Sequence, residues 1–177
     1  MDWYGTIFEL IDMRSFSNLW YWIALATVWS TAGHYVLGIP YDMVGRAARG
    51  GEGAAQAEAD LAALTDIRVR RILYIAEVAG LWLVAIAAAV LTALLVLATV
   101  YGVEFAQAVI LIAAPMTGVG ALSVRTAARI ADHGLEGAAL RRTLGRHRLI
   151  VQAIGLVSVF VTAMWGMFVN LYVGPLL

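Results

Sequence analysis

Long runs of apolar residues, separated by two arginine-rich segments, dominate the pattern along this chain. Four runs approach or exceed the ~20 residues that a helix needs to cross the hydrocarbon core of a membrane. Glycine and proline mark the ends of two of them, at Gly38-Ile39-Pro40 and at Gly174-Pro175. We therefore expect four transmembrane helices, which cover about residues 16–37, 72–100, 105–124 and 149–173.

The connecting segments differ in length and character. Only Tyr101–Glu104 separates the second run from the third, which predicts a tight antiparallel hairpin, and Pro115 predicts a kink inside the third run. The longer connectors, at about residues 40–71 and 125–148, are rich in helix-forming residues and predict short helical extensions beyond the membrane. Residues 2–13 place aromatic and acidic side chains on opposite sides of a helical pattern. This segment predicts an interfacial helix, with an irregular aromatic anchor as the alternative.

Arginine is distributed very unequally between these connectors. The chain has twelve basic residues, all arginine, and all but Arg14 lie in the two long connectors. Basic segments near transmembrane helices stay in the cytoplasm. The pattern predicts that both connectors are cytoplasmic and that both termini lie on the opposite side of the membrane, which is the periplasmic side for a bacterial inner membrane.

Composition supports one membrane domain over residues 1–177. Hydrophobic residues make up 62% of the chain and charged residues 14%, whereas soluble domains are about a quarter charged. A soluble bundle with every helix buried is the alternative, but it would need four such runs in one short chain. The formal net charge is zero, which gives no reason to expect a nucleic-acid partner, and the absence of cysteine excludes disulfides and thiolate metal ligands.

Small and polar residues form a stripe on one face of each predicted span. Lipid tails are as apolar as leucine, so membrane helices meet through small and polar faces. One stripe per helix predicts a closed, all-α four-helix bundle, and oligomerisation through the stripes is the alternative. The clearest stripe, on the fourth span, comprises Gly155, Ser158, Thr162, Gly166 and Asn170.

Two ionisable residues, His34 and Glu77, lie inside predicted spans and are candidates for function by default. Both fall near the cytoplasmic surface, where Arg125 ends the third span and Gln152 begins the fourth. These four residues could form one polar cluster in which Arg125 or protonated His34 compensates Glu77. Three interpretations remain open: a structural lock, an ion or proton site, and a Glu77 that extends to the interface.

No pattern in the chain predicts a cofactor, a metal site or a catalytic residue. His34 is the only histidine in a span, whereas haem binding usually takes ligands from facing helices. No nucleophile–histidine–acid set, phosphate-binding loop or metal-hydrolase spacing is present. We therefore do not expect an enzyme.

Three strings, MDWYGTIFELIDMRSFSNLWYW, YGVEFAQAV and FVTAMWGM, resemble a family of short alphaproteobacterial multi-pass membrane proteins usually labelled "component of SufBCD complex". The resemblance covers most of the chain and implies a bacterial inner-membrane protein. It also implies an accessory role beside iron–sulfur cluster assembly. No cysteine is present to hold a cluster.

The sequence leaves two functions in view. The first is a non-enzymatic accessory or assembly subunit of a larger membrane complex. The second is a small channel or ion/proton carrier, formed by one or several copies of the chain, that uses Glu77 and His34. The expected partners are membrane lipids, a partner membrane protein or a second copy of the chain, and anionic lipid headgroups at the arginine-rich face.

Overall fold

The chain folds almost entirely into α-helices, which confirms the predicted all-α class. The computed structural model describes residues 15–49, 51 and 53–172, so the interfacial helix predicted for residues 2–13 lies outside the described residues. The helical elements are η1 (Ser15–Ser17), α2 (Leu19–His34), α3 (Tyr41–Ala48), α4 (Ala54–Thr99), α5 (Glu104–Asp132) and α6 (Gly137–Tyr172). Strands β1 (Tyr35–Val36) and β2 (Ile39–Pro40) form a small antiparallel hairpin between α2 and α3.

Three helices of the described part of the chain, α4, α5 and α6, are long and apolar enough to cross a membrane. Helix α2 is shorter, with 16 residues. At 1.5 Å per residue it is about 24 Å long. It ends three residues before the predicted boundary because Tyr35 and Val36 are already extended and the chain turns at Leu37 and Gly38.

The turn at Leu37 and Gly38 has positive φ at both residues, 54° and 77°. Glycine adopts this conformation freely, whereas leucine rarely does. The Leu37 side chain is 6% exposed and packs in the hydrophobic core. Its burial offsets the strained backbone.

Helix α5 continues through Pro115 without interruption. Proline has no N–H, so the carbonyl of Leu111, four residues earlier, loses its usual partner in the helix. The hydroxyl of Ser158 on α6 donates to this carbonyl at 3.1 Å. A defect in one helix is therefore repaired by a polar side chain of its neighbour.

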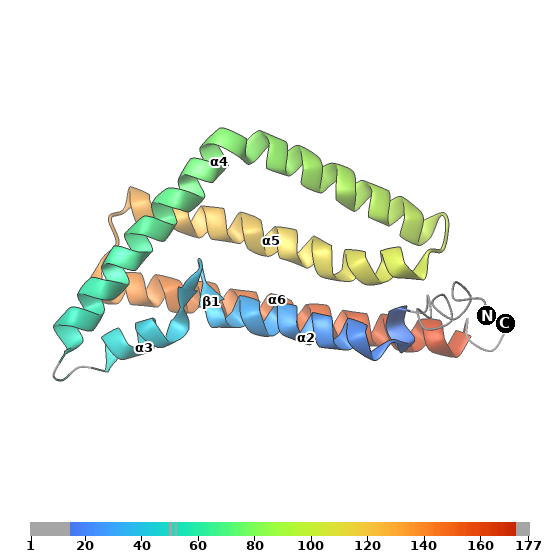
Figure 1. Ribbon diagram of the computed structural model, residues 1–177, viewed down its shortest axis with the longest axis horizontal. Helices are drawn as coiled ribbons and strands as arrows, with labels where there is room; N and C mark the ends of the chain where they lie inside the picture. Colours follow the sequence, from blue (N-terminus) through green and yellow to red (C-terminus); the bar gives the residue numbers. More distant parts are fainter. Residues whose placement is uncertain (1–14, 50, 52, 173–177) are drawn as a thin grey trace, which may run out of the picture.

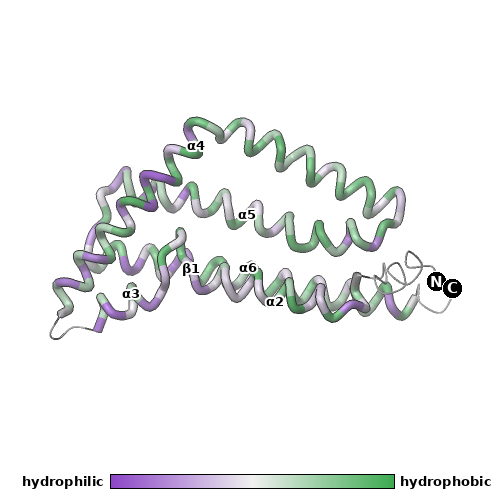
Figure 2. The backbone as a smooth tube through the Cα atoms, in the orientation of Figure 1, coloured by the Kyte–Doolittle hydropathy of each residue, from purple (hydrophilic) through white to green (hydrophobic). Residues whose placement is uncertain are grey.

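The long helices pack mainly on their neighbours, and the Tyr21 hydroxyl of α2 also donates to the carbonyl of Ala108 on α5 at 3.2 Å. Helix α4 packs on α5, α5 on α6, and α6 on α2 (Figure 1). The second half of α4 lies beside α5 and away from α2 and α6 (Figure 1). Hydrophilic residues gather where α3, the start of α4, the end of α5 and the start of α6 meet, and hydrophobic residues dominate the rest (Figure 2). We call these regions the basic end and the apolar half.

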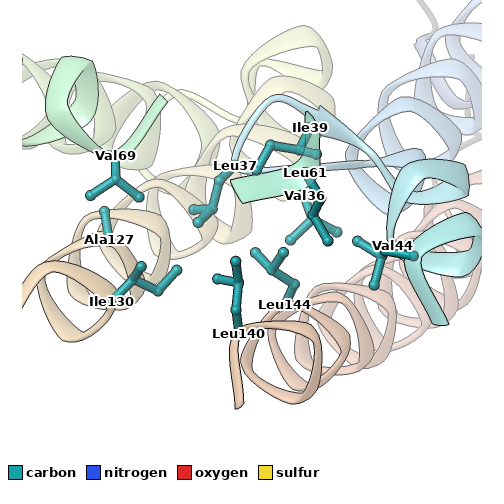
Figure 3. Packing of buried hydrophobic residues seen from close by; sticks show 11 residues of the cluster. Val36, Leu37, Ile39, Val44, Leu61, Val69, Ala127, Ile130, Leu140 and Leu144 are labelled. Atoms are coloured by element: carbon teal, nitrogen blue, oxygen red, sulfur yellow. The ribbon is translucent and has the colours of Figure 1, made fainter. Parts of the chain in front are cut away.

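The largest buried core lies in the basic end. It joins the β-hairpin, α3, the first half of α4, the end of α5 and the start of α6 (Figure 3). Several of its side chains are almost completely enclosed, as in a water-soluble domain. The core residues are Val36, Leu37, Ile39, Val44, Ala47, Leu61, Val69, Ala127, Ile130, Leu140 and Leu144.

The far end of the apolar half is fixed by polar contacts. The backbone N–H of Phe16 donates to Oε1 of Glu104 at 2.8 Å, and the hydroxyl of Ser17 donates to Oδ1 of Asn170 at 2.8 Å. The side-chain amide of Gln107 donates to the carbonyl of Ala98 at 3.1 Å. The start of α5, the end of α6, the end of α4 and η1 therefore meet at this end.

Candidate functional site

The four residues predicted to form a polar cluster lie in three places. His34 and Gln152 line one pocket of about 520 Å³ between α2 and α6. The Gln152 side chain passes Gly33, where a Cβ would lie 3.6 Å from its Cγ. The His34 ring packs edge-on against Tyr35, with the ring centroids 4.9 Å apart. These two residues are brought together at the C-terminal end of α2.

Arg125 and Glu77 lie outside that pocket and do not pair with each other. Arg125 lines a separate pocket between α5 and α6, and Glu77 is exposed on α4. Among the described residues, neither side chain makes an ion pair or hydrogen bond. Glu77 lies 22 residues before the end of α4 and Arg125 lies 21 residues after the start of α5, so both are at a similar distance from the hairpin turn.

The stripe on the fourth helix lies mostly inside the structure. Gly155 faces Trp29 of α2 so closely that a Cβ would lie 2.7 Å from the ring, and a Cβ on Gly166 would lie 3.2 Å from Phe16. Ser158 and Thr162 are buried, whereas Asn170 is exposed and accepts the hydrogen bond from Ser17. The small residues thus let α2 and η1 approach α6.

Arg148 is a structural residue that the sequence pattern did not single out. Its Nε donates to the carbonyl of Gly33 at 3.1 Å, in the last turn of α2, and its guanidinium lies 4.0 Å from the centre of the Tyr41 ring. A cation at a helix C-terminus is stabilised by the unpaired carbonyls there, and the aromatic face adds attraction. The one sequence feature that could have indicated this role is the position of Arg148 immediately before the fourth apolar run.

A basic pocket of about 290 Å³ opens between the end of α5 and the start of α6. Three arginines, one from each of three helical turns, contribute to its lining: Arg125, Arg129 and Arg146. No aspartate or glutamate lines this pocket, and among the described residues none of the three guanidinium groups has an acidic partner. The pocket therefore presents several unpaired positive charges.

His147 forms part of the same pocket and is 4% exposed. Its Nδ1 lies 2.9 Å from the hydroxyl of Thr126, and this hydroxyl donates to the carbonyl of Leu122 at 2.8 Å. A hydroxyl has one hydrogen, so with that hydrogen on Leu122 it accepts from Nδ1–H of His147.

Farther from the basic end, an apolar groove of about 600 Å³ lies between α5 and α6. On α5 it is lined by the turns around Leu111 and Pro115, and on α6 by the turns around Ala153 and Val157. Ser158 is its one polar lining residue, and its hydroxyl is used on Leu111. The two hollows differ sharply in chemistry although they share the same two helices.

Comparisons with protein-family models, with curated proteins and with solved structures found no match for this chain. Among the described residues, no group of three or more histidine, aspartate or glutamate side chains could hold a metal ion. The arrangement offers unpaired cationic groups, apolar faces and packing surfaces.

Proposed function

We propose that this chain is a non-enzymatic, multi-pass membrane protein that serves as an accessory or assembly subunit of a larger membrane complex. In this proposal the four helices α2, α4, α5 and α6 cross a bacterial inner membrane. The basic end lies in the cytoplasm and both termini lie in the periplasm. The asymmetric distribution of arginine supports this orientation, because all the connector arginines belong to segments at the basic end.

The path of α2 supports four crossings. Ser17, before α2, contacts Asn170 near the end of α6, and Gly33, in the last turn of α2, contacts Arg148 near the start of the apolar part of α6. Helix α2 therefore runs antiparallel to α6 and extends through the same layer. A 16-residue helix is short for this task, and η1 adds length at its beginning.

The uncovered apolar half of α4 carries the proposal of an accessory subunit. None of the residues in its most apolar 18-residue window is buried, against 11% for α5 and 28% for α6. Along this half its main neighbour is α5, because its contacts with α3 and the β-hairpin lie in the basic end. Small residues such as Gly80 leave open space, since no side chain lies within 4 Å of the position that a Cβ would take there. A partner's transmembrane helix could pack there closely.

Glu77 is a second feature of this face of α4 that favours contact with a partner. Its carboxylate is exposed on α4 and has no ion pair or hydrogen bond among the described residues. An unpaired carboxylate near lipid is costly unless it reaches the interface, becomes protonated or meets a cation. A basic or hydrogen-bonding group on a partner subunit would remove that cost. The resemblance to proteins labelled as components of a SufBCD complex is compatible with such a role.

The runner-up is a small ion or proton carrier, formed by one or several copies of the chain. The observation in its favour is the same unpartnered Glu77. Against it, His34 lies with Gln152 between α2 and α6, whereas Glu77 is exposed on α4. A path for protons through one copy would need these groups within reach of each other.

A photoreactive amino acid at Leu81 tests the proposal. Leu81 is 83% exposed on α4, and Leu156, 75% exposed on α6, is the matched control. We expect irradiation of native membranes to link position 81 to a different protein of defined mass, with much less product from position 156. A product at twice the mass of the chain, or equal labelling from both positions, would contradict the accessory role.

A flux assay on the purified chain distinguishes the accessory subunit from the ion or proton carrier. In liposomes, we expect no proton or cation flux above that of empty liposomes, because the accessory role requires none. A pH-dependent flux that Glu77→Gln abolishes would replace the proposal with the carrier.

A further inference from the structure

The basic pocket and the apolar groove lie on the same faces of α5 and α6. On α5, Leu111, Pro115, Leu122, Thr126 and Arg129 follow one another in steps of three, four or seven residues. Such steps keep side chains on one face of a helix. The lining residues of both hollows therefore lie on one face of α5, although no residue from 116 to 121 lines either hollow.

Helix α6 repeats this pattern. Thr143, His147, Ile150, Ile154 and Val157 are separated by steps of three or four residues, and they pass from the basic pocket into the apolar groove. Ile150 lines the first hollow and Ala153, one turn on, lines the second. The seam between α5 and α6 thus carries a cationic hollow and, next to it along α6, an apolar hollow. We call the two hollows together the α5–α6 groove, with a cationic head and an apolar tail.

The groove extends from the arginines deep into the predicted span. Arg125 lies in the head, and Ile110, the lining residue of α5 farthest from it, lies 15 residues away along this helix. Fifteen residues of helix span about 22 Å, against ~30 Å for the whole hydrocarbon core. In the proposed orientation, the arginines lie at the level of the headgroups of the cytoplasmic leaflet.

We propose that this groove binds one anionic phospholipid, with its phosphate in the basic pocket and an acyl chain along the apolar part. The inference rests on the membrane location proposed above and is independent of any partner protein. Arginine forks are well suited to phosphate oxygens, and basic pockets between helices on the cytoplasmic side are suited to acidic headgroups. The absence of acidic lining residues leaves these charges available to a ligand.

His147 and Thr126 connect the two walls of the pocket. Their hydrogen bond of 2.9 Å joins α6 to α5 within the lining, and both residues are buried. The guanidinium groups of the three lining arginines supply positive charge to the pocket. Free phosphate shares the chemistry of the head but has nothing to place in the apolar tail, which favours the lipid.

The test is the binding of phosphatidylglycerol to the purified full-length chain in a neutral detergent, measured by native mass spectrometry. Removing one arginine from each helix, with Arg125→Gln and Arg146→Gln together, should weaken binding roughly tenfold or more. The matched control is Arg71→Gln with Arg142→Gln, which removes the same charge from exposed positions that do not line this pocket. Binding by the control should stay within about twofold of the parent chain.

A second pair of variants tests the tail. Ala153→Trp fills the apolar groove and should weaken phosphatidylglycerol binding, whereas Ala163→Trp, an exposed α6 position outside the groove, should not. Every substituted side chain is exposed, so we expect each variant to remain folded. Thermal unfolding of all variants verifies this.

Three outcomes would overturn the inference. Equal losses in the two arginine double variants would show diffuse attraction rather than a site. If Ala153→Trp bound phosphatidylglycerol as tightly as the parent chain, the acyl chain would not lie in the apolar groove. Displacement of the lipid by inorganic phosphate at equal concentration would make soluble phosphate the ligand. Failure of the α4 crosslink would leave all three readouts unchanged, so the two proposals can fail separately.

Discussion

The basic end and the apolar half are built on opposite principles. In the basic end, side chains from five segments enclose one another, and residues such as Leu61 and Leu144 are at most 1% exposed. In the apolar half, side chains of the same type remain uncovered, and Leu81 is 83% exposed. Water drives burial in the first region, whereas lipid tails would solvate the second equally well. In the proposed membrane orientation, the chain therefore holds its helices together mainly in the region that meets water.

The largest expected effect comes from the core of the basic end. Leu144→Ala should lower the free energy of unfolding by about 2–5 kcal/mol, because it leaves a cavity in a site that is 0% exposed. Leu81→Ala, the matched change on α4, should cost less than about 0.5 kcal/mol. Unfolding in detergent measures both. Equal losses would mean that the two regions are stabilised alike.

The next prediction concerns the seam between α2 and α6, where Gly155 lies against Trp29. Gly155→Ala should cost about 1–3 kcal/mol, because its Cβ would lie 2.7 Å from the Trp29 ring. Gly118→Ala on α5 meets nothing within 4 Å and should be neutral or slightly stabilising, since alanine favours helix. Melting temperatures in detergent compare the two variants. A larger loss for Gly118→Ala would contradict the arrangement of the helices.

The smallest effect tests the repaired helix. Ser158→Ala should cost about 0.6 kcal/mol, a typical value for a hydrogen bond between membrane helices, because the Leu111 carbonyl loses its donor. In a Pro115→Ala background the helix can supply its own N–H, so Ser158→Ala should cost less there. A double-mutant cycle gives the coupling. A coupling of zero would mean that Ser158 and Pro115 act independently.

Much of the helical layout could be predicted from the sequence. Apolar runs and breakers indicated the hairpin near Tyr101–Glu104, and α4 and α5 do end and begin there. The end of α2 was placed too late, because a positive φ at Leu37, a residue that disfavours it, left no signal in the pattern. The helix-forming residues before the second span predicted a helical extension, and α4 is indeed a single 46-residue helix through connector and span.

The candidate sites were harder to predict because they depend on which faces are covered. In the sequence, Gly155 and Gly118 are both small residues on a predicted membrane helix. In the structure, Trp29 lies against Gly155, whereas no atom of another helix lies within 4 Å of the Cβ position at Gly118. The basic pocket required Arg125 and Arg146, which are 21 positions apart, to meet across two helices. Spacing along one helix predicts a face, whereas only the packing of α5 against α6 decides what that face meets.

Single cysteines in this cysteine-free chain test the central claim, that the apolar half crosses the membrane with the basic end inside. Tyr101 (71% exposed) and Val84 (68% exposed) lie in the apolar half, and Ala131 is exposed in the basic end. In intact spheroplasts, an impermeant thiol reagent should label Tyr101→Cys alone. After permeabilisation it should also label Ala131→Cys, while Val84→Cys stays unreactive because lipid covers it. Labelling of Ala131→Cys from outside, or of Val84→Cys after permeabilisation, would contradict this orientation.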